Sequence, residues 1–488
     1  MTRYSIKKMS SLHRSNLMRN SFWGLAANVS QSVLMSLLYV ILARKYTTAD
    51  FSSFLIANSI YQFLATISNL GLGQWFTREI VGSANGESIV GKFLKLQLYS
   101  GAGFYFANCL LALLLYDNPE IRVLTMLMGI NIVFDNLIYV IKCLNIARSA
   151  QNITFKIILA DTVLKFLGIL FLLFFPFSIM TLTLGLIGIR FLTLNLFLKY
   201  GSGGALDLKL LVSYKISLKE VTGIILANWP FLVIGSVSIV YWRIGNIIIS
   251  KMLSLLDVAV YEISFRVFSV FQIFPVIVSA SVFPHLVALH NSGETAQFNA
   301  AYKRYFYSFL VYGVFVYTFI YSFSGQIIPF VFGQKYAAAP VFTREMFLTM
   351  LLFPTGVLQA TVLIAMKLER TDMMINIISL IVSVALIFAG LSFIHSLTVV
   401  NISIFVSFLV FHICQDYVLV RRKILTIRSV LNFYLFTTAL VVGYVLLAPG
   451  FRSIAFFTGV WGLAAVLGVT QRIRSARSQS AIANPHSL

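Results

Sequence analysis

The chain alternates long apolar runs with short polar segments. Many runs contain about 20 mostly apolar residues, the length that an α-helix needs to cross the hydrocarbon core of a membrane. The pattern therefore predicts an all-α membrane protein with about 14 transmembrane helices, called spans below. The predicted spans lie near residues 21–43, 51–70, 93–116, 121–141, 155–177, 178–199, 220–250, 258–284, 305–324, 345–366, 373–394, 397–418, 430–448 and 452–470.

The composition excludes several other classes of protein. Hydrophobic residues make up 59% of the 488 residues and charged residues only 11%. A soluble, disordered or nucleic-acid-binding chain needs more polar and charged residues than this. In a soluble protein, a formal net charge of +21 would indicate nucleic-acid binding. In a membrane protein it indicates basic cytoplasmic loops beside anionic lipid. We therefore expect membrane lipids as partners and no nucleic acid.

The basic residues are unevenly divided between the two sides of the membrane. With an even number of spans, both termini lie on one side, and that side holds most of the 37 Lys and Arg residues. Because cytoplasmic loops are enriched in Lys and Arg, both termini are predicted to be cytoplasmic. The loops on the opposite side hold only Arg44, Lys45, Arg122, Lys251, Lys335, Arg344 and Arg452.

The spacing of matched residues predicts an internal repeat. Asp50 and Asp257 are 207 positions apart (257 − 50), and Gly86 and Gly293 keep the same spacing (293 − 86). Two six-span halves in parallel orientation explain this, and chance matches among few charged residues are the alternative. Parallel repeats are typical of transporters, whose substrate site lies at the interface of the repeats.

These observations together predict six segments along the chain. They are a basic cytoplasmic N-terminal tail at 1–20, an N-terminal lobe at 21–199, a cytoplasmic linker at 200–219, a C-terminal lobe at 220–420, two accessory spans at 421–470 and a basic cytoplasmic C-terminal tail at 471–488.

Several charged residues lie inside the predicted spans. Each costs about 2.5–3.5 kcal/mol at the membrane centre, so each is expected to face protein or water. The basic residues are Lys165, Arg190, Arg243 and Arg266, and acidic residues lie at Asp135, Asp161 and Glu262.

Two pairs of these charges are four residues apart on one helix face. Asp161 precedes Lys165, and Glu262 precedes Arg266, a spacing at which opposite charges meet. The pairs are either structural ion pairs that let the helices insert or parts of a functional cavity. The sequence leaves both interpretations open.

Arg190 and Arg243 have no such local partner. Arg190 lies too deep in its span to reach the membrane surface. Arg243 lies in the outer part of span seven, so its side chain either faces the lumen or extends to the membrane interface. Asp135 is available as a partner for either arginine. We expect a water-filled lumen with a positive excess, which suits an anionic group such as phosphate.

Short motifs in both halves resemble one family of membrane proteins, the polysaccharide (O-antigen) flippases of the multidrug/oligosaccharidyl-lipid/polysaccharide exporter superfamily. The resemblance covers roughly residues 20–420. In the first half the motifs are Trp23, Ile41-Leu42-Ala43-Arg44, Asp50-Phe51, Asn69-Leu70-Gly71-Leu72-Gly73 and Arg78-Glu79. In the second half they are Tyr241-Trp242-Arg243-Ile244, Val260-Tyr261, Pro275, Phe283-Pro284, Phe332-Gly333-Gln334-Lys335-Tyr336 and Asn376.

The resemblance implies a V-shaped bundle of two six-helix lobes followed by two further helices. It implies a flippase that moves undecaprenyl-diphosphate-linked oligosaccharide, such as an O-antigen repeat unit, across the bacterial inner membrane by alternating access. A polysaccharide polymerase and a chain-length regulator are the protein partners that such a role suggests. The substrate-binding residues are then expected to be the lumen cations, Arg190, Arg243, Arg266 and Lys165, together with Arg78.

The resemblance also implies coupling to a proton or sodium gradient, with no organic cofactor. Related proteins often carry an acid shortly after the arginine of span seven, where this chain has Gly245-Asn246. The coupling ion is therefore expected at one of the three intramembrane acids, Asp135, Asp161 or Glu262.

Three other functions remain as alternatives. A lipid II flippase fits the spans and the positive lumen, and a multidrug cation antiporter fits the fold but needs unpaired acids. A membrane polymerase or glycosyltransferase needs a catalytic external loop, and the longest one here, near 325–344, contains no acid. We therefore expect a transporter and not an enzyme. No metal site is expected, because His285 and His290 lack partners at metal-ligand spacing.

Overall fold

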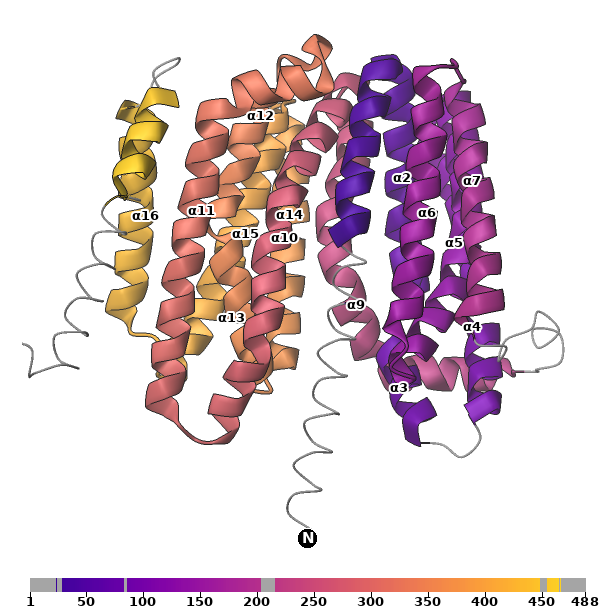
Figure 1. Ribbon diagram of the computed structural model, residues 1–488, viewed down its shortest axis with the longest axis horizontal. Coiled ribbons are helices and arrows are strands. Elements are labelled where there is room, and N and C mark those ends of the chain that lie inside the picture. The colour runs from indigo at the N-terminus through magenta and orange to yellow at the C-terminus, as the bar shows by residue number, and fades with distance from the viewer. Residues whose placement is uncertain are drawn as a thin grey trace, which may run out of the picture.

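The computed structural model describes residues 23, 29–82, 86–202, 216–447, 454–464 and 466. Within these residues all regular structure is helical. The helices run side by side in two lobes that meet at one end of the bundle and separate toward the other (Figure 1). Nine of the described helices are long and apolar enough to cross a membrane, so the chain is a multi-pass membrane protein. The number of 14 spans stays a prediction.

The N-terminal lobe contains the helices drawn from indigo to magenta in Figure 1. Helices α5 and α7 begin where the sequence supplies a cap: Asn118 accepts hydrogen bonds from two backbone N–H groups, and Ser178 accepts one. Such caps satisfy the first N–H groups of a helix. The helices are residues 29–45, α2 Thr48–Ser68, α3 Gly73–Gly82, α4 Gly86–Leu115, α5 Pro119–Ala147, α6 Gln151–Leu170 and α7 Ile179–Leu196, which ends in a π-turn at Phe197–Gly201.

The C-terminal lobe follows, with α16 at its outer edge (Figure 1). Two of its helices are longer than the predicted spans at 258–284 and 305–324, since α10 has 37 residues and α11 has 38. At about 1.5 Å per residue, both exceed a hydrocarbon core of about 30 Å. Their polar ends continue beyond it, where hydropathy does not mark the helix terminus. The helices are α9 Leu218–Met252, α10 Leu255–Asn291, α11 Thr295–Phe332, α12 Ala339–Met346, α13 Phe353–Ala365, α14 Glu369–Phe393, α15 Leu397–Arg421, α16 Ile427–Leu447 and residues 454–464.

The structure explains why Asp50 and Asp257 are 207 residues apart. Helix α2 begins at Thr48 and α10 at Leu255, a separation of 207 residues (255 − 48). The hydroxyl of the residue before each helix accepts a hydrogen bond from the backbone N–H of Asp50 in α2 and of Asp257 in α10. The matched acids therefore lie in the first turns of equivalent helices. There their negative charge interacts favourably with the positive end of the helix dipole.

The two halves differ further along these helices. After α2, Leu70 and Gly71 have φ angles of 54° and 59°, so the chain turns before α3. In the second half α10 continues through this region as one helix that contains Pro275 and Pro284. A backbone break in one lobe thus corresponds to a proline-containing helix in the other.

The tenth predicted span is interrupted. A 3₁₀ turn at Phe347–Leu351 separates α12 from α13, and Pro354 lies in the first turn of α13. Proline has no N–H to donate to the carbonyl of Met350, four residues earlier. Gly313 of α11 packs against that carbonyl so closely that a Cβ atom on it would lie 2.8 Å from the oxygen.

The lobes are joined at the end of the bundle where the first helix ends. The guanidinium of Arg44 donates to the carbonyls of Phe330 and Val331, the latter at 2.6 Å. In the opposite direction, Lys335 Nζ donates to the carbonyl of Tyr46 at 2.5 Å. These contacts close one end of the space between the lobes.

We predict that Gly313→Ala destabilises the protein by about 1–3 kcal/mol, because the added methyl group must displace the backbone at the break. Thermal unfolding of the purified protein in detergent measures this. The control is Gly185→Ala in α7, where a Cβ meets nothing within 4 Å and helix propensity favours alanine by about 1 kcal/mol. Equal melting temperatures for the two variants would contradict the packing argument.

Candidate functional site

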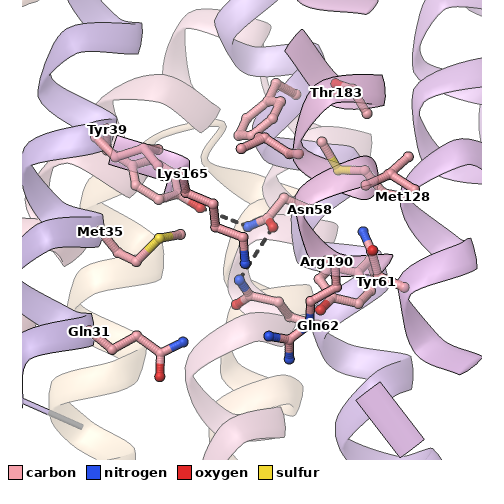
Figure 2. A pocket seen from close by; sticks show the side chains of 15 residues that line it. Gln31, Met35, Tyr39, Asn58, Tyr61, Gln62, Met128, Lys165, Thr183 and Arg190 are labelled. Atoms are coloured by element: carbon pink, nitrogen blue, oxygen red, sulfur yellow. Dashed lines mark hydrogen bonds between the residues drawn. The ribbon is translucent and has the colours of Figure 1, made fainter. Parts of the chain in front are cut away.

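A cavity opens between five helices of the N-terminal lobe (Figure 2). Its volume is about 150 Å³, which is less than the roughly 300–1,000 Å³ usual for a complete ligand site. Figure 2 shows Lys165 of α6 and Arg190 of α7 reaching into it toward Gln62 of α2. The other lining residues are Gln31, Met35, Leu38, Tyr39, Phe54, Asn58, Tyr61, Met128, Asn131, Thr183, Leu186 and Ile187.

Both cations of the cavity are held by carboxylates behind them. Lys165 Nζ lies 2.8 Å from Asp161 Oδ2. Arg190 Nε donates to Asp135 Oδ1 at 2.6 Å, and Arg190 Nη1 lies 3.6 Å from Asp161 Oδ1. The hydroxyl of Tyr61 donates to the other oxygen of Asp135. These contacts hold α2, α5, α6 and α7 together through charge.

The ion pairs present their positive ends to the cavity. The side chain of Asp161 is 1% exposed, whereas those of Lys165 and Arg190 are each 14% exposed and that of Asp135 is 16% exposed. Both cations line the cavity, and neither Asp135 nor Asp161 does. A ligand in the cavity therefore meets ammonium and guanidinium groups directly, with the acids at a greater distance.

A second charged cluster lies between α9 and α10. Glu262, which is 1% exposed, lies 2.5 Å from Arg266 Nη2 and 3.4 Å from Arg243 Nη1. Asn246 Nδ2 donates to Glu262 Oε2 at 2.6 Å. One acid thus serves two arginines, so the cluster has a formal charge of +1.

This second cluster contacts the N-terminal lobe. The guanidinium of Arg266 stacks 3.7 Å from the centre of the Tyr39 ring, and Asn246 Nδ2 lies 3.0 Å from Ser59 Oγ. Tyr39 also lines the first cavity, where Asn58 donates to its hydroxyl at 2.9 Å (Figure 2). Tyr39 therefore lines the first cavity and also contacts the second cluster.

The structure brings most of the expected site residues into these two clusters. Asp135, which the sequence left open as a partner, pairs with Arg190 and not with Arg243. Arg243 is 11% exposed and pairs with Glu262, so it does not extend to the membrane surface. The side chain of Arg78, in α3, is outside the described residues.

Sequence reasoning missed several polar residues of these regions. Lys142 of α5 is close to the Asp135–Arg190 pair, but it lies one residue beyond the predicted fourth span. Asn58 and Gln62 line the cavity, and two amides four residues apart inside an apolar span were the signal that could have identified them. His412 and Asp416, four residues apart within the predicted span 397–418, were also missed.

We predict that Glu262→Gln destabilises the protein by about 3–5 kcal/mol, because it leaves two buried arginines without a counter-charge. Thermal unfolding in detergent checks this, with the exposed Glu294→Gln as the control. Adding Arg266→Met to Glu262→Gln removes one unpaired cation and should recover part of the loss. A double variant no more stable than Glu262→Gln alone would contradict the electrostatic cause.

Comparison with known proteins agrees with this architecture. The structure resembles the lipid II flippase MurJ in an inward closed conformation, with a TM-score of 0.67 and 14% identity over 93% of this chain and 99% of that one. It also resembles an inward-facing multidrug resistance MATE transporter of the MOP superfamily, with a TM-score of 0.63 and 13% identity over 82% and 94% of the two chains. A MOP superfamily transporter from Pyrococcus furiosus matches with a TM-score of 0.56 and 14% identity over 87% and 96%.

These likenesses show the fold of the MOP superfamily, and no curated protein matches the sequence. The family itself comes from a sequence model described as polysaccharide biosynthesis protein, which matches residues 41–340. That match covers more than half of the chain, over both charged clusters, and the chain therefore belongs to this family of polysaccharide biosynthesis proteins.

Proposed function

We propose that the protein is a flippase that moves a polyprenyl-diphosphate-linked oligosaccharide, such as an O-antigen repeat unit, across the bacterial inner membrane. The observation that carries this proposal is the cavity that Lys165 and Arg190 line while their acidic partners lie behind them. Membership of a polysaccharide biosynthesis family supports a glycan as the cargo. A polysaccharide polymerase and a chain-length regulator remain the expected partners of this role.

The charge of the cavity suits a diphosphate. Guanidinium groups bind phosphate oxygens in a bidentate manner, and the attraction is stronger where little water competes. The relative from Pyrococcus furiosus is described as having a binding pocket of reverse polarity, which suggests a different function for it. For this chain, the cations that line the cavity support an anionic cargo.

The size of the cavity limits what it holds. About 150 Å³ accommodates the anionic headgroup but not an oligosaccharide, so the glycan would occupy the space between the lobes outside it. Arg243 and Arg266 lie across Tyr39 from this cavity. They would receive the diphosphate or the first sugar as the lobes move, while the polyprenyl chain remains in the lipid.

The closed end of the bundle supports alternating access. With both termini in the cytoplasm, the contacts of Arg44 and Lys335 lie at the outer face. The lobes would then open toward the cytoplasm, where the lipid-linked glycan is made. Flipping requires these contacts to break while the ion pairs inside each lobe persist.

A lipid II flippase is the second candidate, favoured by the likeness to MurJ over 93% of this chain. Its cargo also carries a diphosphate, so the same cavity would serve. A multidrug cation antiporter is disfavoured, because no acid is among the residues that line the described cavity. Competition by lipid II in a flipping assay with an O-antigen precursor would distinguish the two diphosphate cargoes.

We predict that Gln62→Glu reduces flipping at least tenfold, because it places a carboxylate in front of Lys165 and Arg190 without removing any ion pair. A tenfold loss corresponds to about 1.4 kcal/mol. The measurement is transfer of a fluorescent polyprenyl-diphosphate glycan across the membrane of proteoliposomes. Gln62→Met removes the hydrogen bond to Asn58 without adding charge, and it should retain most of the activity.

Arg190→Lys complements this variant. It keeps the charge and the pairing with Asp135 but loses the bidentate geometry, so an intermediate rate is expected. Full activity in both Gln62→Glu and Arg190→Lys at matched expression would exclude the cavity as the headgroup site.

The proposed orientation gives a separate prediction. Single cysteines at Asp117, in the loop between α4 and α5, and at Ser292, after α10, lie at opposite ends of the bundle. In intact cells a membrane-impermeant maleimide should label Asp117→Cys and not Ser292→Cys, because only the first is outside. Permeabilised cells should show both labelled. The reverse pattern would place the termini outside the cytoplasm.

A further inference from the structure

A buried polar cluster in the C-terminal lobe lies apart from the two cationic clusters. His412 and Asp416 occupy consecutive turns of α15 and are 0% and 4% exposed. Nδ1 of His412 lies 3.0 Å from Oδ2 of Asp416. Ionisable residues buried inside a membrane span are costly and are usually retained for function.

The counter-charge of Asp416 is of a different kind from that of the other intramembrane acids. Asp135, Asp161 and Glu262 each pair with arginine or lysine. Asp416 has His412 as its only basic partner within 4.0 Å in the described part of the chain. The net charge of this cluster therefore depends on whether the imidazole carries a second proton.

Hydrogen bonds from two other helices hold the carboxylate in place. Gln359 of α13 donates to Asp416 Oδ1 at 2.7 Å, and the Tyr434 hydroxyl of α16 donates to Oδ2 at 2.8 Å. Tyr434 OH also lies 2.8 Å from His412 Nδ1. Through Tyr434 the cluster thus attaches α16, which lies at the edge of the lobe (Figure 1), to α15.

No lysine or arginine of the described residues forms an ion pair with Asp416. Tyr302 of α11 contacts Gln359, and Asp372 of α14 is bound by Gln415. Lys303 of α11 is exposed and lines the same groove as Asp416 without pairing with it. The titratable or charged groups around the pair are Tyr302 and Lys303 from α11, Asp372 from α14, Cys414 from α15 and Tyr434 from α16.

The site satisfies its hydrogen bonds with or without the extra proton. His412 Nε2 lies 2.9 Å from Thr355 Oγ1, which is also 3.0 Å from the carbonyl of Leu352. When the imidazole is neutral, the Thr355 hydroxyl donates to Nε2. When it is protonated, Nε2–H donates to the hydroxyl oxygen, and the hydroxyl turns to the carbonyl. One proton is therefore taken up at the cost of one hydroxyl rotation.

Two further contacts bear on the charge of the imidazole. The Phe433 ring of α16 stacks on the His412 ring with centroids 5.3 Å apart and planes at 13°, an arrangement that favours a cation. Asp416 and Phe433 also line a groove of about 660 Å³ between α11, α15, α16 and the helix at 454–464. Thr355 lies in the first turn of α13, beside the interruption of the tenth span.

The two protonation states have opposite effects on packing. With the proton bound, imidazolium and carboxylate neutralise each other and are stable away from water. Without it, a net negative charge remains, and its burial against apolar helices is unfavourable unless water enters. Loss of the proton should therefore favour separation of α16 from the lobe.

We propose that His412 and Asp416 form a proton-binding site whose occupancy controls the packing of α16 against α11 and α15. A proton gradient would act on transport at this site, and this part of the inference rests on the proposed flippase function. A ligand shifts a conformational equilibrium only through different affinity for the two states, and a proton does so here through the charge of the cluster.

The test measures the separation of α16 from α11 as a function of pH in the purified full-length protein. Spin labels are attached at Tyr307→Cys of α11 and Asn432→Cys of α16, which line the groove, after Cys109, Cys143 and Cys414 are changed to Ala. Electron paramagnetic resonance then gives the distance distribution at roughly pH 5 and roughly pH 8, the range in which histidine usually changes charge. The longer distance should be more populated at the higher pH.

Two substitutions should have opposite effects. Asp416→Asn removes the negative charge and should hold the short distance at both pH values. His412→Gln leaves Asp416 without a basic partner and should favour the long distance at both. The exposed controls Asp117→Asn and His395→Gln should keep the pH response of the parent protein. If His412→Gln fails to fold, Asp416→Asn decides alone.

A distance that is independent of pH in the parent, or a pH response that persists in Asp416→Asn, would overturn the proposal. Flipping in proteoliposomes under a proton gradient tests its link to transport, and stimulation by the gradient should be lost in Asp416→Asn. Flipping that the gradient stimulates equally in that variant would refute the link. A parent protein that flips no glycan but shows the pH-dependent distance would refute the proposed function and leave the proton site supported.

Discussion

The neutralisation of buried charge is the constraint on which the arrangement of this bundle depends. An isolated carboxylate inside a membrane protein is strongly unfavourable, so it needs a cation or hydrogen-bond donors as partners. Asp135 and Asp161 meet Arg190 and Lys165, which places α5, α6 and α7 side by side. Glu262 meets Arg243 and Arg266 and fixes α9 against α10. The same ion pairs orient the cations toward the space where cargo would bind.

The contacts between the lobes are weaker than those within them. Polar contacts between the lobes include the Arg266–Tyr39 stack, the hydrogen bond from Asn246 to Ser59, and the hydrogen bonds of Arg44 and Lys335 at the closed end. Each contributes about 0.5–2 kcal/mol. Breaking a buried ion pair inside a lobe would cost about 3–5 kcal/mol. Separating the lobes as rigid bodies therefore leaves the buried ion pairs intact, whereas rearranging either lobe would break them. This difference in strength is what alternating access requires.

Features carried by local spacing could be predicted from the sequence, whereas contacts between distant helices could not. The all-α membrane fold and the i, i+4 pairs of Asp161 with Lys165 and of Glu262 with Arg266 follow from spacing alone. The pairing of Asp135 with Arg190 joins residues 55 positions apart, and no local pattern encodes it. The interruption of the tenth span depends on Gly313 packing against another helix. His412 and Asp416 also have the i, i+4 spacing, but Asp416 lies two residues from the end of the predicted span 397–418 and was not among the expected intramembrane acids.

The three carboxylate clusters differ in how their charge responds to conditions. Guanidinium keeps its proton at any physiological pH, so the charges of the clusters of Asp135 with Arg190 and of Glu262 with Arg243 and Arg266 stay constant. That constancy suits the binding of a diphosphate, whose own charge varies little. The cluster of Asp416 uses histidine instead, the side chain whose charge changes most readily near neutral pH. It also lies at the contact with α16 and the interrupted tenth span, where we propose that a change of charge alters the packing of α16. In this arrangement the cargo would be bound by arginine and lysine, whose charge is permanent, and the packing of α16 would depend on a histidine, whose charge is not. A proton could then change the conformation of the protein without weakening the binding of the substrate.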